Sequence, residues 1–370
     1  MNKSFKVVFS KARSALMVVN EATSSIQAKG TKTVIAVAAA MVAGGAMAAI
    51  PTGAVEITDS QAMTTPAGKT AADHASLVVR PSVEQTFYYS ELSYGNSAKV
   101  DGVTLSYMAQ GKDESGQQLP NQLRIIGGTV SGFDVTLKES TVTGDFKTGF
   151  GGSVFEAIAT PGSNTAAAGN LNVLVDGVTF ADNKSTELGG VGFISGVSNF
   201  TIQNSTHTGN SVGAEGSKQA DGGVYAFVNS SKGSITGSTF TGNSAKNAGG
   251  ALLVSNTAVK IDKSVFDGNT AVTMGGAIKT DNTSDLTITN SSFTNNVVGE
   301  GKTGHGGAVY VSGTTPVIVD ASEFTGNKAG HGGAFYIQGQ TATFTDTVFT
   351  NNEAYEYGGA LRVNTGNVPV

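Results

Sequence analysis

Aspartates recur at one position of an internal repeat, where they could serve as catalytic acids or bases. Asp176, Asp262 and Asp320 share this position with Gln203, Thr236, Thr289 and Thr345. An enzyme that cleaves glycosidic bonds needs carboxylates that converge on one face of the protein. Because Asp262 and Asp320 are separated by a threonine repeat, we expect them to bond turn backbone rather than to form a catalytic pair.

Histidines occupy a second repeated position. His305 and His331 each precede a Gly-Gly pair, and we expect their rings to stack about 5 Å apart if the repeats stack. A metal site needs a third or fourth ligand, and the nearest candidate, Asp221, lies several repeats away. The chain has no cysteine, which excludes thiol catalysis and cysteine-bound zinc. The sequence therefore predicts no catalytic residue, no metal and no cofactor, so that the protein is not an enzyme.

Composition limits the classes of partner. The 370 residues are 39% hydrophobic but only 14% charged, which favours a folded chain over a charge-rich disordered one. The formal net charge is −5. An acidic protein is a poor partner for nucleic acid or for anionic lipid, so we expect neither.

The first residues have the pattern of an export signal. Six basic residues precede an apolar run from Val34 to Ala43, and Ala46 and Ala48 stand at the −3 and −1 positions of a cleavage site. We predict a signal peptide over residues 1–48. Its removal leaves 17 basic and 27 acidic residues, a formal charge of −10.

The rest of the chain repeats. Gly-Gly pairs begin at positions 151, 189, 222, 249, 275, 306, 332 and 358, with a base interval of 26 residues. Before most pairs stands a Phe-x-x-Asn motif, in which His207 replaces the phenylalanine once. Its most regular members are Phe240, Phe266, Phe293, Phe324 and Phe349, followed by Asn243, Asn269, Asn296, Asn327 and Asn352.

Apolar residues alternate with polar ones after each Gly-Gly pair, which indicates short strands. Strands that repeat without hairpin spacing predict an all-β, right-handed parallel β-helix with an irregular N-terminal cap. We expect phenylalanines to stack inside, His207 to substitute for one of them, and asparagines to take left-handed turn geometry while bonding the next coil. The predicted boundaries are a flexible start with an N-terminal cap and irregular coils at 49–140, and β-helix repeats of about 26 residues at 141–370.

Two motifs resemble known families. The segment from Met1 to Glu21 resembles the extended signal peptide of Gram-negative type V secreted proteins, which implies Sec-dependent export. Gly275-Gly276-Ala277-Ile278 and Phe266-Asp267-Gly268-Asn269 resemble repeats of chlamydial polymorphic outer membrane proteins and related autotransporter passengers. The resemblance implies a surface-exposed, commonly adhesive passenger attached to a C-terminal β-barrel translocator. No barrel pattern precedes Val370, so we expect the chain to be a fragment or a truncated product.

One outward column of the predicted β-helix carries residue types enriched in binding interfaces. Tyr310, Tyr336 and Arg362 fall on successive coils, and alternation of the strand directs them away from the core. We predict that this stripe binds a protein or glycan of a host or neighbouring cell. The leading hypothesis is a non-catalytic adhesive passenger at the cell surface or outside the cell. The alternatives are a secreted β-helix polysaccharide lyase or hydrolase, and a structural biofilm matrix protein.

Overall fold

The computed structural model describes residues 121–132, 134–135, 152–158, 171–213, 220–282, 284–339 and 341–364, and the backbone of short strands between residues 5 and 108. The chain divides into two units, Met1–Ile50 and Pro51–Val370. In the first unit, β1 (Phe5–Ser10) pairs antiparallel with β2 (Ala15–Asn20). The predicted cleavage site at Ala46 and Ala48 lies outside the described residues.

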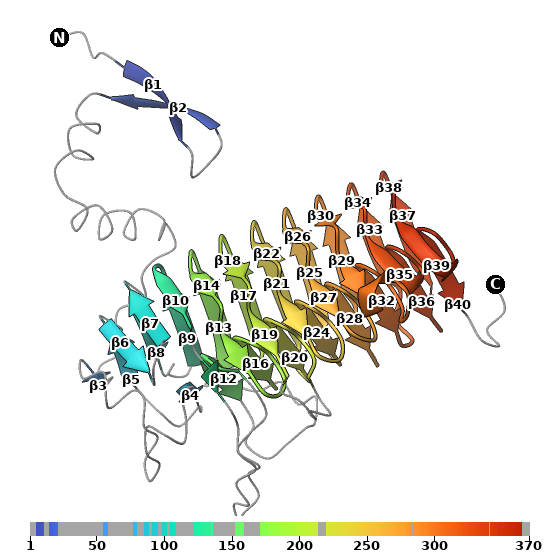
Figure 1. The fold of residues 1–370 in the computed structure, drawn as a ribbon. Helices are drawn as coiled ribbons and strands as arrows, with labels where there is room; N and C mark the ends of the chain where they lie inside the picture. Colours follow the sequence, from blue (N-terminus) through green and yellow to red (C-terminus); the bar gives the residue numbers. More distant parts are fainter. Residues whose placement is uncertain are drawn as a thin grey trace, which may run out of the picture. The chain divides into compact units, whose positions relative to one another are not determined.

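The second unit is a parallel β-helix in which each regular coil contributes one strand to each of four sheets (Figure 1). We number the sheets in the order in which the chain visits them. Within the described part of the chain, sheet 1 follows the Gly-Gly pairs and contains β4 (Leu77–Val79), β12 (Phe155–Ile158), β16 (Gly192–Ser195), β20 (Tyr225–Val228), β24 (Leu252–Ser255), β28 (Ile278–Asp281), β32 (Val309–Ser312), β36 (Phe335–Gln338) and β40 (Leu361–Asn364). Sheet 2 contains β3 (Val55–Ile57), β5 (Gln85–Tyr88), β8 (Thr104–Met108), β9 (Asn121–Ile126), β13 (Leu171–Asp176), β17 (Asn199–Gln203), β21 (Lys232–Thr236), β25 (Ala258–Asp262), β29 (Leu286–Thr289), β33 (Val317–Asp320) and β37 (Ala342–Thr345).

The two remaining sheets are built from shorter strands. Sheet 3 contains β6 (Glu91–Tyr94), β7 (Ala98–Asp101), β10 (Thr129–Ser131), β14 (Thr179–Ala181), β18 (Thr206–Thr208), β22 (Thr239–Thr241), β26 (Val265–Asp267), β30 (Ser292–Thr294), β34 (Glu323–Thr325) and β38 (Val348–Thr350). Sheet 4 contains β11 (Asp134–Val135), β15 (Lys184–Ser185), β19 (Ser211–Val212), β23 (Ser244–Ala245), β27 (Thr270–Ala271), β31 (Val297–Val298), β35 (Lys328–His331) and β39 (Glu353–Tyr357). A 3₁₀ turn, η1 (Gly299–Gly301), follows β31.

The parallel register begins ahead of residue 141. Strands β9, β10 and β11 pair in parallel with β13, β14 and β15, so they belong to a coil that lies inside the range predicted as cap and irregular coils. Before this coil the pairing changes, because β8 runs antiparallel to β9 and β7 runs antiparallel to β10. Antiparallel strands therefore continue sheets 2 and 3 beyond the first parallel coil.

Stacked aromatic rings of sheet 3 form the centre of the core. Phe240, Phe266, Phe293 and Phe324 are fully buried, with neighbouring ring centroids 4.6 to 4.7 Å apart and nearly parallel planes. This arrangement confirms the predicted internal column. Because the same position of each repeat holds a phenylalanine, a shift in register would take the rings out of contact. The column therefore favours stacking of the coils in register.

The asparagine of each Phe-x-x-Asn motif forms a buried ladder. The Asn269 amide nitrogen donates to Asn296 Oδ1 at 3.0 Å and to the Phe240 carbonyl at 2.9 Å. Its Oδ1 accepts from the backbone and the side chain of Asn243. All four hydrogen-bonding positions of the amide are thus satisfied in a site without water access. The predicted bond between the side chain and the backbone of a neighbouring coil is present, but to the preceding coil, and the bond to the next coil is to a side chain.

The left-handed geometry predicted for these asparagines is wrong. Positive φ angles occur instead at the residue directly before each ladder position, such as Asp182 at 55° and Asn295 at 54°. The reason is that an amide which must reach the coils on both sides needs an inward side chain in extended backbone. The bend is therefore made one residue earlier, often by glycine.

The Gly-Gly pairs lie where backbone segments of the same coil and of the next coil come close together. Gly275 has a φ of 59°, and a Cβ atom there would also collide with the Ile278 carbonyl. At Gly276 a Cβ atom would collide with the carbonyl oxygen of Gly307 in the next coil. The first glycine is required by conformation and the second by contact between coils, which confirms the predicted close approach.

Candidate functional site

The tyrosines of the predicted binding stripe are buried. Tyr310 and Tyr336 retain only 6% and 4% of their exposed area, while Arg362 is half-buried. The two tyrosine rings stack at 5.5 Å, and Tyr310 Oη donates to Gln338 while Tyr336 Oη accepts from Asn364. Neither ring offers a free face, so the prediction that these tyrosines form an open stripe is wrong.

Residues that precede the Gly-Gly pairs cover this outer face of sheet 1. His305 lies 4.5 Å from the Tyr336 ring, measured between centroids. Several coils earlier, Leu188 packs against the cluster formed by Phe193, Ala226 and Leu253. Alternation correctly separates this column from the main core. Strand alternation could not show that the connection between sheets 4 and 1 folds back over this outward column.

The two histidines stack as predicted, with ring centroids 5.0 Å apart and planes 14° apart. Arg362 donates to His331 Nδ1 at 2.8 Å, and Glu356 lies 3.6 Å from His331 Nε2. Burial, followed by the charges of His331 and Arg362, lowers the pKa of His305. Within the described ranges, no group of three or more metal-ligating side chains comes together. His305 therefore covers Tyr310 and Tyr336, and the ring of His331 stacks on His305.

On the same outer face of sheet 1, the middle coils carry a charged pair in place of the rings. Lys279 Nζ lies 3.1 Å from Asp221 Oδ2, and both side chains are mostly buried. Asp221 Oδ1 also accepts from Asn247 Nδ2 and from the backbone of Ala248. The charge of Asp221 is thereby neutralised and hydrogen-bonded, which is the arrangement that makes a partly buried carboxylate tolerable.

Two aspartates of the repeated column, Asp176 and Asp262, accept hydrogen bonds from side chains of the next coil. Asp262 Oδ1 accepts from Thr289 Oγ1 at 2.7 Å and from Asn290 Nδ2 at 2.8 Å, and these bonds lower its pKa. The predicted bonds to turn backbone are therefore wrong for Asp262. Thr289 stands between Asp262 and Asp320 in the register of sheet 2. The carboxylates of this column do not converge.

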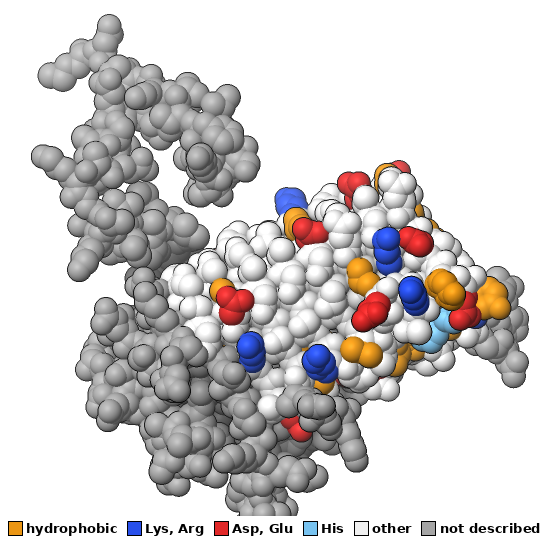
Figure 2. Space-filling view, in the orientation of Figure 1, with side chains coloured by type: hydrophobic (Ala, Val, Ile, Leu, Met, Phe, Trp, Pro, Cys, Tyr) orange, Lys and Arg blue, Asp and Glu red, His pale blue; other side chains and the backbone are white. Residues whose placement is uncertain are grey.

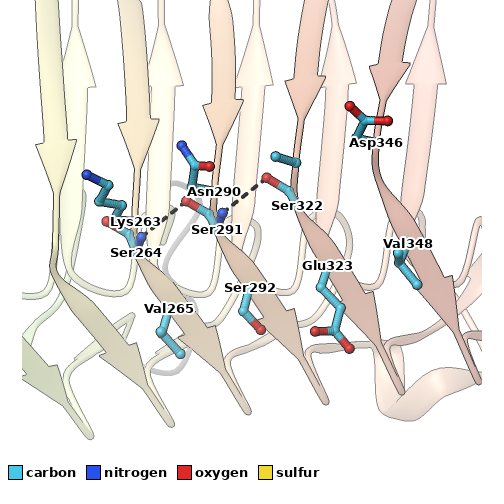
Figure 3. Close-up of a pocket in the computed structure, with 11 residues that line it drawn as sticks. Lys263, Ser264, Val265, Asn290, Ser291, Ser292, Ser322, Glu323, Asp346 and Val348 are labelled. Atoms are coloured by element: carbon cyan, nitrogen blue, oxygen red, sulfur yellow. Dashed lines mark hydrogen bonds between the residues drawn. The ribbon is translucent and has the colours of Figure 1, made fainter. Parts of the chain in front are cut away.

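An open groove crosses four coils at the bend between sheets 2 and 3 (Figure 3). We call it the corner groove; its volume is about 510 Å³. One side is formed by the residue at the bend of each coil, which we call the bend row. The other side is formed by the first outward residue of each sheet 3 strand, or a residue at the equivalent position, and serines form the floor. These three rows are Lys263, Asn290, Ala321 and Asp346; Val265, Ser292, Glu323 and Val348; and Ser264, Ser291 and Ser322.

The floor of the corner groove is a hydroxyl ladder that holds the coils in register. The backbone nitrogen of Ser264 donates to Ser291 Oγ at 3.1 Å, and the nitrogen of Ser291 donates to Ser322 Oγ at 3.1 Å. Each hydroxyl also donates to a carbonyl two residues earlier, as from Ser291 to Thr289 at 2.7 Å. Because these serines are buried and satisfied, a ligand would meet the two side rows instead.

Sequence reasoning missed the corner groove, although the sequence contains a signal. The bend row holds Gly177, Asn204 and Gly237 in the earlier coils, and then changes to Lys263, Asn290, Ala321 and Asp346. In the face shown in Figure 2, charged and apolar side chains are likewise more frequent over the later coils than over the earlier ones. The corner groove thus lies at the coils in which the residue types of the bend row change.

Comparison with known protein families gives two matches at opposite ends of the chain. Residues 1–50 match the extended signal peptide of the type V secretion system, and residues 189–369 match the right handed beta helix region. No curated protein and no solved structure was found to match the chain. Together the two family matches support an autotransporter passenger that contains a right-handed β-helix.

The predicted fold, its handedness and the type V signal are confirmed by these matches. The signal directs export across the inner membrane to the cell surface or the extracellular space, and it implies Sec export and an outer-membrane translocator. The narrower resemblance to polymorphic outer membrane proteins stays a prediction. Among the residues that the structure describes, no helix has both the length and the apolar character needed to cross a membrane.

Proposed function

We propose that this passenger is a non-catalytic adhesive module that binds a component of a host or neighbouring cell surface. The observation that carries the proposal is the corner groove, which is open to solvent and lined by exposed side chains from four successive coils. A site of this form suits an extended ligand that lies across the coils. A solenoid also presents a long surface for its mass, which favours contact between surfaces.

Rigidity supports a binding role. The asparagine and serine ladders join each coil to the next through buried hydrogen bonds, so the two rows of the corner groove are held at the spacing of the sheets. A surface that is ordered before binding loses less conformational freedom when a ligand arrives. The coils therefore form a preorganised frame for the groove residues.

The enzyme alternative keeps one specific observation in its favour. Glu323 and Asp346 both line the corner groove from adjacent coils, and a pair of carboxylates is what a glycoside hydrolase uses. Both side chains are exposed, whereas a general acid of this class commonly sits in an apolar pocket. We therefore place polysaccharide hydrolysis second.

Attachment of the exported chain to cells tests the proposal. Fluorescent beads coated with the purified protein should bind epithelial or bacterial cells above the level of beads coated with heat-unfolded protein. In parallel, the protein should release no reducing ends and no unsaturated sugars from a panel of acidic and neutral polysaccharides. Release that disappears in the Glu323→Gln and Asp346→Asn double variant would replace the adhesive proposal with the enzyme.

The matrix alternative is separated by the same beads. Beads that aggregate with one another and ignore every cell type would indicate a structural protein that associates with its own copies. Binding to cells without such aggregation supports an adhesive role. The bead assay thus distinguishes attachment from self-association without knowledge of the ligand.

A further inference from the structure

Backbone strain is concentrated in the bend row of the corner groove. Lys263 and Ala321 have φ angles of 49° and 45°, a region that L-residues other than asparagine and aspartate enter at a cost of about 1 kcal/mol. Both side chains are exposed, so packing does not offset this cost. Earlier coils avoid it with Gly177 and Gly237 at the same bend. The bend has a positive φ in each of these coils, so the fold imposes the conformation, and the coils of Lys263 and Ala321 adopt it without glycine, asparagine or aspartate.

Charges of opposite sign lie at the two ends of the corner groove. Lys263 is exposed on the first of the four coils, while Glu323 and Asp346 are exposed on the third and fourth. Among the described residues, none of these three takes part in an ion pair within 4.0 Å. Lys263 does act on the neighbouring Asp262 carboxylate, and Glu323 accepts from Thr325 Oγ1. The groove therefore presents a cationic end and an anionic end to a ligand.

Two valines stand in the sheet 3 row of the corner groove, with their side chains in solvent. Val265 is 39% exposed and Val348 is 54% exposed. The equivalent outward positions of β14, β18 and β22 are threonines. No aromatic ring lines the groove, so the stacking surface on which sugars commonly pack is missing from its lining. Exposed aliphatic side chains between separated charges fit a peptide better than a glycan.

We propose that the corner groove binds an extended peptide segment that carries an acidic and a basic side chain, with aliphatic residues between them. The coil spacing of about 4.8 Å puts Lys263 roughly 10 Å from Glu323 and roughly 14 Å from Asp346 along the axis. An extended chain rises about 3.3 Å per residue, so the acidic and basic residues of the ligand stand three or four positions apart. This inference rests on the proposed adhesive function and names the chemistry of its ligand.

Three synthetic peptides test the charge arrangement. The mixed probe is Asp-Val-Thr-Val-Lys, and the other two carry lysine or aspartate at both ends. Binding to the full exported chain is measured by fluorescence anisotropy at low and high salt. The wild type should prefer the mixed probe about fivefold or more, and the preference should shrink at high salt because exposed charges are screened.

Charge reversal should move the preference in a defined direction. Lys263→Glu makes both ends of the groove anionic, so the probe with two lysines should become the best ligand. Lys232→Glu is the matched control, because Lys232 is exposed on sheet 2 outside the groove and its reversal changes the net charge equally. This control should keep the preference of the wild type. Circular dichroism of each variant verifies that the β-helix is retained.

The proposal is overturned if the three probes bind alike, or if Lys263→Glu leaves their order unchanged. It is also overturned if a neutral oligosaccharide binds the wild type and loses affinity in the Lys263→Glu variant, while no peptide shows this behaviour. The bead assay distinguishes failure of the peptide proposal from failure of the proposed adhesive function. Beads that attach to cells while no peptide binds would leave the adhesive role intact and remove only the peptide ligand.

Discussion

His207 should make the coils around it sensitive to acid. Its ring is fully buried between Phe180 and Phe240, at 5.5 and 4.3 Å between centroids. Nδ1 lies 3.1 Å from the Thr239 carbonyl, which only accepts, so Nδ1 carries the proton. Nε2 then accepts from Tyr225 Oη at 3.0 Å. The neutral ring has a partner at each nitrogen, and a second proton would have none.

The size of the effect follows from the pKa. Burial lowers the pKa of His207 from 6.5 to about 3, against a weaker opposing effect of the Thr239 hydrogen bond. Below pH 6.5 the unfolded chain binds a proton that the folded chain rejects, so the free energy of unfolding falls as the pH falls. The loss is about 2 kcal/mol at pH 5 and about 4 kcal/mol at pH 3, with an upper bound of about 5 kcal/mol at lower pH.

Hydrogen exchange of amides in β18 and β22 provides a local measurement, which is needed because repeat arrays do not unfold as one cooperative unit. After correction for intrinsic rates, protection in the wild type should decrease between pH 7 and pH 5. The matched variant is His207→Phe with Tyr225→Phe, which restores the aromatic column and removes the hydroxyl partner. His207→Phe alone leaves a buried hydroxyl unpaired, at a cost of about 1 to 3 kcal/mol at every pH.

The double variant should lose the pH dependence that histidine contributes and keep only that of the carboxylates. If wild type and double variant lose protection equally between pH 7 and pH 5, then His207 is not the group that titrates. Equal behaviour would refute the argument that burial holds this ring neutral.

Three further substitutions test the columns of the core. Phe266→Ala removes a ring from the middle of the stack and should cost about 3 to 5 kcal/mol in urea unfolding, with Phe266→Leu clearly milder. Asn269→Ala leaves the Asn243 donors and the Phe240 carbonyl of the preceding coil unsatisfied and removes one of the two donors to Asn296 Oδ1, so hydrogen exchange there should accelerate at least tenfold, while the exposed Thr270→Ala should have little effect. Gly276→Ala places a Cβ atom against the next coil and should abolish soluble folded protein. Gly268→Ala, which meets nothing within 4 Å, should cost only about 1 kcal/mol of backbone strain and fold normally.

Much of the core could be predicted because each position of the repeat has one steric role. The phenylalanines fill the inside, the asparagines bond between coils, and the second glycine of each pair admits a neighbouring backbone. His207 could be placed in the core because it occupies a phenylalanine position. The side of each strand on which Tyr310 and Tyr336 lie also followed from alternation, since successive strand residues point to opposite faces.

Exposure could not be predicted in the same way. Whether Tyr336 meets water depends on His305, which comes from the connection between two sheets, and strand alternation does not show where that connection folds. The sequence also could not show which residue of a bend takes the left-handed conformation. Asparagine is common at such positions, but the ladder amide needs extended backbone, and only the packed coils impose that requirement.

The amino-acid sequence by itself determined the export signal, the repeat and the register, because these depend on residue type at regular intervals. The tertiary structure alone decided which outward columns are covered and where the corner groove opens. A strand's period fixes the side of the sheet on which a side chain stands. Burial depends on which other segment packs against that side, and such contacts join residues that lie far apart in the chain.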